Sequence, residues 1–309
     1  MGWTIKDAMK KISIFSTILL TLLFLTSCNS TPKSNNGHLK ILASTTFLAD
    51  IAQNIAGDRA KVDSLLPFDA DPHAYQPAPS DVADISASNV LILNGLKYES
   101  FIQPLLNNAD GDRLIITASS GLEPRQLEEE PGVIANDPHM WLDPKRVIKY
   151  VENIRDGLIK ADPAGANIYN ANAKAYIMQL NNLDAWIVEQ VNTIPADQRL
   201  LVTNHEALGY FADRYGFTIV ATVIPSVSTD ASTSAKELAA AIDQVKASHA
   251  PAIFLDKVEN SKLANQIAEE TGIKVVDDLH LESLTNGTPA ATYIDMMKHN
   301  VMRIVDGLK

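Results

Sequence analysis

Cysteine is nearly absent from the 309-residue sequence, which contains only Cys28. A single cysteine excludes a disulfide framework and any metal site built from several thiolates. Basic residues are also scarce, because 26 lysines and arginines stand against 37 aspartates and glutamates, and the formal net charge is -11. This balance leaves no basic face for phosphates, so no nucleic-acid partner is expected. Functional chemistry in this chain must therefore use histidines, carboxylates and hydroxyls.

Long hydrophobic runs are also missing. The apolar run Ile12–Leu25 spans about 14 residues, whereas a membrane-spanning helix needs about 20. Three lysines precede it, which is the pattern of a secretory signal peptide. The run leads into Leu-Thr-Ser-Cys28, which resembles the lipobox of bacterial lipoproteins, whose cysteine becomes the lipidated first residue of the mature chain. We expect residues 1–27 to be a signal peptide, Cys28 to be lipidated and residues 28–37 to form a flexible polar tether. The alternative is an ordinary signal peptide with an incidental cysteine.

The remaining composition, with 46% hydrophobic and 20% charged residues, is that of a globular protein and excludes disordered and multi-spanning membrane classes. After residue 38, short apolar runs alternate with helix-like segments, which favours an α/β fold with parallel sheets. Strands are predicted at 39–44, 61–66, 90–93, 114–117, 200–203, 218–223, 252–255 and 274–277. Helices are predicted at 47–56, 80–86, 98–106, 207–215, 234–248, 262–271 and 291–308.

The alternation is interrupted between residues 143 and 194 by a helical pattern. From Pro163 to Ile194, apolar residues recur at steps of three and four, with no glycine after Gly165 and no further proline before Pro195. A helix of about 30 residues would be about 45 Å long, which is typical of a connector rather than of a domain helix. We therefore predict two βα domains with parallel sheets, 38–162 and 196–309, joined by one connector helix at 163–195.

Two of the seven histidines lie in the same tripeptide. His73 and His139 each follow Asp-Pro, so that Asp71 and Asp137 stand two residues before an imidazole. Histidines that bind metals usually donate their second ring nitrogen to a carboxylate, a carbonyl or water, and each aspartate is placed for that role. The repeated motif therefore marks both histidines as candidate metal ligands.

Two further candidates follow predicted strands directly. His205 comes after the strand at 200–203, and Glu282 comes after the strand at 274–277, at the edge where α/β sheets bind ligands. With His73 and His139 they can converge in the cleft between two half-sheets, and three imidazoles with one carboxylate suit Zn²⁺ or Mn²⁺. His280 competes with Glu282 as the fourth ligand. The other histidines show no such context and are interpreted as structural or solvated: His38, His249 and His299.

The motifs carry a family resemblance that covers nearly all of the chain after residue 38. Asp-Pro-His followed by Tyr and Pro, Asp-Pro-His-Met-Trp-Leu-Asp-Pro, Asn-His-Glu-Ala-Leu-Gly-Tyr-Phe-Ala-Asp-Arg-Tyr-Gly and the C-terminal Thr-Tyr-Ile-Asp-Met-Met-Lys-His-Asn resemble, in this order, the solute-binding lipoproteins of bacterial zinc and manganese ABC importers. The resemblance implies two βα domains bridged by one rigid helix, with the metal in the interdomain cleft. It implies His73, His139 and His205 as three ligands, and Glu282 before Ser283 at the position of the fourth, where the family usually has aspartate.

The resemblance also implies that the protein captures one divalent metal ion, Zn²⁺ or Mn²⁺, and delivers it to the membrane permease subunit of an ABC importer. It is expected to be a monomer that is exported and anchored through Cys28 to the cell envelope, in the periplasm or on the outer face of the cytoplasmic membrane. One departure is that the loop 121–136, with its acidic run Glu128–Glu130, lacks the histidines of many zinc receptors.

An exported metal-dependent hydrolase is the alternative function. It would use the same three histidines, a bound water and either Glu206 or Glu282 as general base. A catalytic site keeps one coordination position open for water, whereas a receptor has no need of one. The sequence contains no nucleophile motif and no His-Glu-x-x-His pattern, which favours a receptor over an enzyme. A cell-adhesion or signalling lipoprotein on the same fold is compatible with the receptor interpretation.

Overall fold

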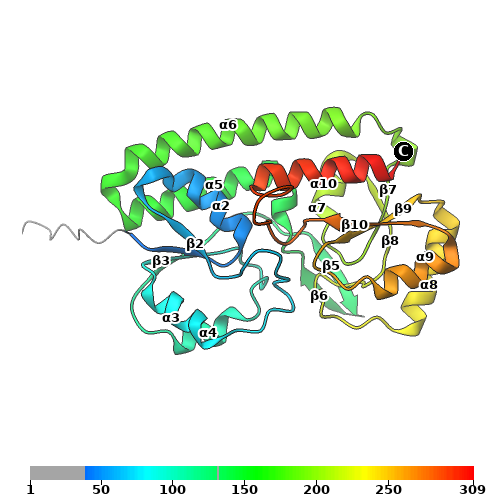
Figure 1. Cartoon of the computed structure of the whole chain (residues 1–309), viewed down its shortest axis with the longest axis horizontal. Coiled ribbons are helices and arrows are strands. Elements are labelled where there is room, and N and C mark those ends of the chain that lie inside the picture. The colour runs from blue at the N-terminus through cyan, green and yellow to red at the C-terminus, as the bar shows by residue number, and fades with distance from the viewer. Residues whose placement is uncertain (1–38, 131) are drawn as a thin grey trace, which may run out of the picture. The chain divides into compact units, whose positions relative to one another are not determined.

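The structure, a computed structural model, describes residues 39–130 and 132–309. The predicted signal peptide, Cys28 and the tether lie outside these residues. Within them, the fold is α/β and contains two four-stranded parallel sheets and one two-stranded hairpin. Figure 1 shows the sheets in two lobes, with a long helix, α6, running alongside both.

The first lobe is built on a sheet with the strand order β2-β1-β3-β4. Its strands are β1 (Ile41–Ala43), β2 (Val62–Ser64), β3 (Val90–Leu93) and β4 (Leu114–Thr117), and its helices include α2 (Thr46–Ala56), α3 (Pro79–Ala87) and α4 (Ile102–Asn108). Alternate residues of each strand face opposite layers: Leu42 and Leu91 share a core with α3 and α4, whereas Ile41 and Ile92 share one with α2. Burial on both faces explains why the central strands β1 and β3 are entirely apolar, whereas the edge strand β2 carries Asp63 and Ser64.

The second lobe is built in the same way, with the strand order β10-β9-β7-β8. Its strands are β7 (Leu200–Thr203), β8 (Thr218–Thr222), β9 (Ala252–Asp256) and β10 (Lys274–Leu279), and its helices are α7 (Gly209–Tyr215), α8 (Ala235–Ser248), α9 (Lys262–Thr271) and α10 (Tyr293–Gly307). Local sequence sets several of these bounds. Ser234 and Glu237 form a capping box at the start of α8, and Gly272 ends α9 in the left-handed conformation.

The predicted connector corresponds to α6 (Ala166–Val191), whose 26 residues give a length of about 39 Å. It starts later than predicted because α5 (Pro144–Ala161) ends first and a 3₁₀ turn at Pro163–Gly165 intervenes. One stripe of α6 is buried at steps of three and four: Tyr169, Ala173, Tyr176, Leu180, Leu183, Ile187 and Val191. The helix packs against α2 and α5 of the first lobe and against α10 of the second.

The two lobes share one hydrophobic core. The largest cluster of buried side chains contains Ile41 and Ile92 of the first sheet, Phe254 and Val276 of the second sheet, and the buried stripe of α6. Residues 39–309 accordingly form one compact unit by their contacts. The domain boundaries at 162/163 and 195/196 therefore remain a prediction from the sequence. The hydrophobic core is continuous across both of them.

The segment 121–136, predicted as a loop, contains an antiparallel hairpin of β5 (Gln126–Glu130) and β6 (Val133–Asn136). The strand β5 is mostly charged, so it lacks the alternation of apolar and polar residues from which a strand could be predicted. Glu129 of this hairpin contacts the second lobe, where its carboxylate accepts hydrogen bonds from Ser226 Oγ (2.6 Å) and Val227 N (2.9 Å). In the described ranges, no helix is long and apolar enough to cross a membrane.

The packing of α6 makes a prediction about stability. Leu180 is fully buried in the shared core, so Leu180→Ala should lower the free energy of unfolding by about 2–5 kcal/mol. Met178 lies on the same helix but is 60% exposed, so Met178→Ala should change it by less than about 0.5 kcal/mol. Urea denaturation of the two variants measures the difference, and equal losses would contradict the role of α6 as a core element.

Candidate metal centre

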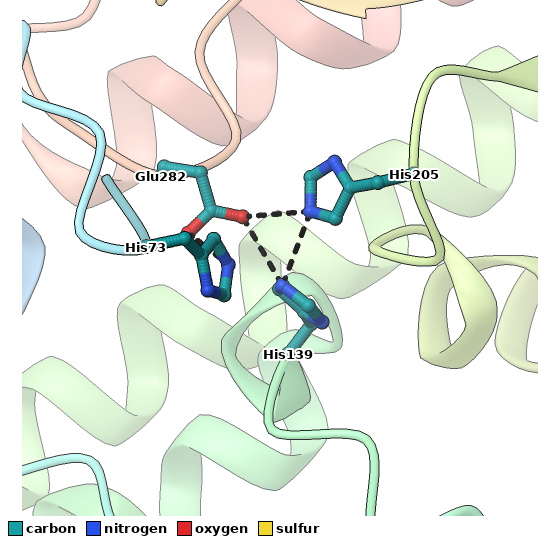
Figure 2. Close-up of side chains that lie close together, drawn as sticks. All are labelled: His73, His139, His205 and Glu282. Atoms are coloured by element: carbon teal, nitrogen blue, oxygen red, sulfur yellow. Dashed lines mark hydrogen bonds and ion pairs between the residues drawn. The ribbon is translucent and has the colours of Figure 1, made fainter. Parts of the chain in front are cut away.

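Four predicted site residues converge at one point between the lobes. His73, His139, His205 and Glu282 each offer a ligand atom, and these atoms all lie within 4.8 Å of one another. Figure 2 shows the four side chains pointing inward from four different segments of the chain. His73 follows β2, His139 precedes a 3₁₀ turn at Met140–Leu142, His205 follows β7, and Glu282 follows β10. His280, the competing candidate, is not a member of this group.

The carboxylate of Glu282 lies at the centre of the group. Its Oε1 is 3.2 Å from His139 Nε2 and 3.3 Å from His205 Nε2, and its Oε2 is 4.0 Å from His73 Nε2. The two nitrogens of His139 and His205 are 3.3 Å apart. All four side chains are at least 94% buried, since their exposed fractions run from 0 to 6%. The arrangement therefore concentrates polar atoms in a space that bulk water does not reach.

Two of these inward-facing atoms have no hydrogen-bond partner among the described residues. They are His73 Nε2 and Glu282 Oε1, and both are fully shielded from solvent. An unpaired polar atom in a protein interior carries a free-energy cost, so native structures nearly always pair such atoms. Both atoms carry a lone pair, so a cation bound at the point that they face would pair them.

His139 is oriented by the aspartate of its own motif. Its Nδ1 lies 2.9 Å from Asp137 Oδ1, which turns Nε2 toward the centre and confirms the partner predicted from the Asp-Pro-His motif. The other motif behaves differently. Asp71 Oδ1 accepts a hydrogen bond from the backbone N of His73, and its Oδ2 accepts one from Thr229 Oγ1 (2.7 Å) in the second lobe. Asp71 thus shapes the loop and links the lobes, and the expectation that it holds the imidazole of His73 is wrong.

The groups that hold His205 and Glu282 were not predicted from the sequence. Glu259 Oε1 contacts His205 Nδ1, and Glu259 Oε2 accepts a hydrogen bond from Asp256 N (2.8 Å). The buried carboxylate of Asp256 accepts hydrogen bonds from the backbone N of Leu281 and of Glu282. The end of β9 thus connects the ends of its two neighbours, β7 and β10. The rule that ligands gather at the carboxyl edge of parallel strands was the available signal, and it applies to β9 as well.

Tyr98 is a second missed contact. Its hydroxyl donates a hydrogen bond to Glu282 Oε2 at 2.5 Å. The sequence predicted Tyr98 as the start of a helix, but α4 begins only at Ile102, and Leu96 and Lys97 have positive φ values of 57° and 66°. Left-handed conformations are costly for such residues and mark a constrained turn. This turn directs the tyrosine into the site. Burial raises the pKa of Tyr98 well above its usual value, so its hydroxyl stays protonated.

The electrostatics differ among the histidines. Burial lowers the pKa of His73 to about 3, and the nearby Glu282 offsets this only in part. Burial also disfavours charge on His205 and His139, but the carboxylates of Glu259, Asp137 and Glu282 outweigh it and raise both pKa values. In turn, His139 and His205 overcome the effect of burial on Glu282 and hold its pKa well below its usual range. The pKa values of His139, His205 and Glu282 are thus set by one another's proximity as well as by burial, whereas burial dominates at His73.

The chain resembles known metal-binding proteins over nearly all of its described length. The family model described as "Zinc-uptake complex component A periplasmic" matches residues 41–307. The manganese-binding lipoprotein MntA of Halalkalibacterium halodurans is 38% identical over 304 residues, which cover 97% of this chain and 99% of that protein. The iron-binding protein YfeA of Yersinia pestis is 31% identical over 303 residues, 97% of this chain and 96% of that protein. A solved structure of the Mn-bound periplasmic metal-binding protein of Candidatus Liberibacter asiaticus aligns with a TM-score of 0.79 at 28% identity, covering 88% of this chain and 100% of that chain.

The titrating groups predict how the ion-free protein responds to pH. His73 has a lowered pKa, so its contribution to stability is lost as pH falls from about 6.5 toward 3. His205 has a raised pKa, so its contribution is present below about pH 6.5 and is lost as pH rises through the raised value. In the presence of a chelator, these groups should make stability greatest near pH 6.5. Urea unfolding between about pH 5 and 8.5 measures this. His205→Gln should flatten the alkaline decline, and an unchanged decline in that variant would contradict the assignment.

Proposed function

We propose, because the chain belongs to the family of periplasmic zinc-uptake complex component A proteins, that it is the solute-binding lipoprotein of an ABC-type metal importer. It captures one divalent metal ion, Zn²⁺ or Mn²⁺, outside the cytoplasm and delivers it to the membrane permease subunit of the importer. The family match and the metals in the names of its relatives support this function. The buried group of three histidines and one glutamate supports it independently.

The proposed ligands are His73, His139, His205 and Glu282. The observation that carries this assignment is the pair of unpaired buried atoms, His73 Nε2 and Glu282 Oε1, facing the same point. Three imidazole nitrogens and one carboxylate oxygen are ligands that both metals accept. A metal binds imidazole only in its neutral form, so it competes with protons for His139 and His205, whose pKa values are raised. Affinity therefore falls as the medium acidifies.

A binding protein fits the site better than a hydrolase. The relatives are named as metal-binding and transport proteins, and none of the comparisons supports a hydrolase. The geometry agrees, because four protein ligands leave a tetrahedral site without a position for a reacting water. Glu206, one of the proposed general bases, accepts a hydrogen bond from Thr222 Oγ1 (2.7 Å) and is not a member of the group of four.

The ligand assignment predicts selective effects of substitution. His205→Ala removes a ligand and should weaken binding of Zn²⁺ and Mn²⁺ by more than the roughly 10–100-fold that loss of an outer hydrogen-bond partner costs. His249 is exposed at the end of α8 in a left-handed conformation, which asparagine tolerates, so His249→Asn is the matched control and should leave affinity unchanged. Titration calorimetry with a competing chelator measures both variants. Comparable losses in the two would refute the assignment.

Anchoring through a lipid on Cys28 is supported by the lipobox-like sequence and by relatives that are named lipoproteins. When the chain without substitutions is expressed in a bacterial host, it should fractionate with membranes and be released by detergent, because the acyl chain on Cys28 inserts into the bilayer. Cys28→Ser should move the protein to the soluble extracytoplasmic fraction while leaving its affinity for metal unchanged. Identical fractionation of both forms would show that this cysteine does not anchor the chain.

A further inference from the structure

We propose that Tyr98 sets the metal preference of the site by confining Glu282 to a single ligand oxygen, which keeps the centre four-coordinate and favours Zn²⁺ over Mn²⁺. This inference rests on the proposed function and deepens it by naming the residue that discriminates between the two candidate ions. Tyr98 does not touch the ion in this scheme and acts through the carboxylate.

The two oxygens of Glu282 have different surroundings. Oε2 accepts the hydrogen bond from the Tyr98 hydroxyl at 2.5 Å. Oε1 has no hydrogen-bond partner among the described residues and lies 3.2 and 3.3 Å from the Nε2 atoms of His139 and His205. Figure 2 shows Oε1 turned toward these two rings. One oxygen is therefore free for a cation at the centre, while the other is already held.

Tyr98 is fixed firmly enough to maintain this difference. Its side chain is buried at 2% exposure, with its ring 4.8 Å from the ring of Trp141 and edge-on to His73 at 5.4 Å. The turn at Leu96 and Lys97 restricts the backbone that carries it. A short hydrogen bond to a buried carboxylate is charge-assisted and roughly twice as strong as a neutral one. The bond occupies one lone pair of Oε2 and fixes the orientation of the carboxylate, so Oε2 is a weaker second ligand than Oε1 is a first.

The consequence differs between the two metals. Zn²⁺ is satisfied by four ligands in a tetrahedron, which three imidazoles and one oxygen supply. Mn²⁺ prefers carboxylate, carbonyl and water oxygens in an octahedral arrangement, so it gains from a carboxylate that binds through both oxygens. With Oε2 held by Tyr98, Mn²⁺ has fewer oxygen ligands from the protein than it prefers. The tyrosine thus adds to the general advantage that Zn²⁺ has over Mn²⁺ at sites of nitrogen and oxygen.

The test compares Tyr98→Phe with Tyr293→Phe in the full chain. Tyr293 is also a buried tyrosine with a hydroxyl hydrogen bond, but its acceptor is the backbone oxygen of Trp141 (2.6 Å) rather than a ligand. Dissociation constants for Zn²⁺ and Mn²⁺ are measured by chelator competition in each. In Tyr98→Phe, the ratio of the Mn²⁺ constant to the Zn²⁺ constant should fall about 10-fold, as expected for one charge-assisted hydrogen bond. Tyr293→Phe should leave the ratio unchanged.

Cobalt substitution supplies a readout that a purely structural role would not alter. Co²⁺ bound to the chain without substitutions should show the intense visible absorption of four-coordinate cobalt. Tyr98→Phe should weaken this absorption, because both oxygens of Glu282 then bind the ion. Weak absorption in the unmodified protein would overturn the inference without any variant, even if Tyr98→Phe did not fold. Equal changes in both dissociation constants would also overturn it. If the unmodified chain bound neither Zn²⁺ nor Mn²⁺, the proposed function would fail as well, whereas normal binding with an unchanged ratio would refute the role of Tyr98 alone.

Discussion

The burial of one carboxylate determines much of the structure around it. Glu282 is fully inaccessible to solvent, and an ionised group in that position is costly unless charges and hydrogen bonds compensate it. Asp256 fixes its backbone, Tyr98 donates to one oxygen, and the imidazoles of His139 and His205 lie beside the other and lower the pKa of the carboxyl. The same two imidazoles are proposed ligands of the cation, so they serve both the ion-free and the metal-bound site.

The parallel sheets explain how residues far apart in sequence reach this carboxylate. Parallel strands present all their carboxyl ends at one edge, and the crossover helices keep these ends close together. In the second lobe, His205, Glu259 and Glu282 follow the ends of the adjacent strands β7, β9 and β10 by two or three residues. In the first lobe, the segments after β2 and β3 bring His73 and Tyr98 to the same place. The topology thus supplies the ligands and their supporting groups together.

The sequence predicted those parts that depend on local pattern. The strands at 90–93 and 114–117 and the helix at 262–271 have the predicted bounds, because apolar runs and terminal glycines are local signals. The histidines were recognisable because their motifs are local too. Tyr98 was assigned to a helix, and Glu259 received no role, because each acquires its partner only when distant segments meet. Pairing across the fold, such as Asp71 with Thr229, leaves no periodicity in the sequence.

The shared core restricts how the site can open. Below the metal centre, Trp141 donates its indole N–H to the backbone oxygen of Leu281 (2.8 Å), and the buried cluster continues from there through both lobes. Separating the lobes would expose that apolar surface to water, at a free-energy cost of about 25 cal/mol for each Å² exposed. At other points the lobes meet through a few hydrogen bonds, among them one from Thr229 to Asp71 and two from Ser226 and Val227 to Glu129. Each such bond contributes only about 0.5–1.5 kcal/mol, and somewhat more where a carboxylate accepts it. Access to the centre is therefore easiest through rearrangement of the loops that carry these bonds, with α6 and the core beneath it unchanged.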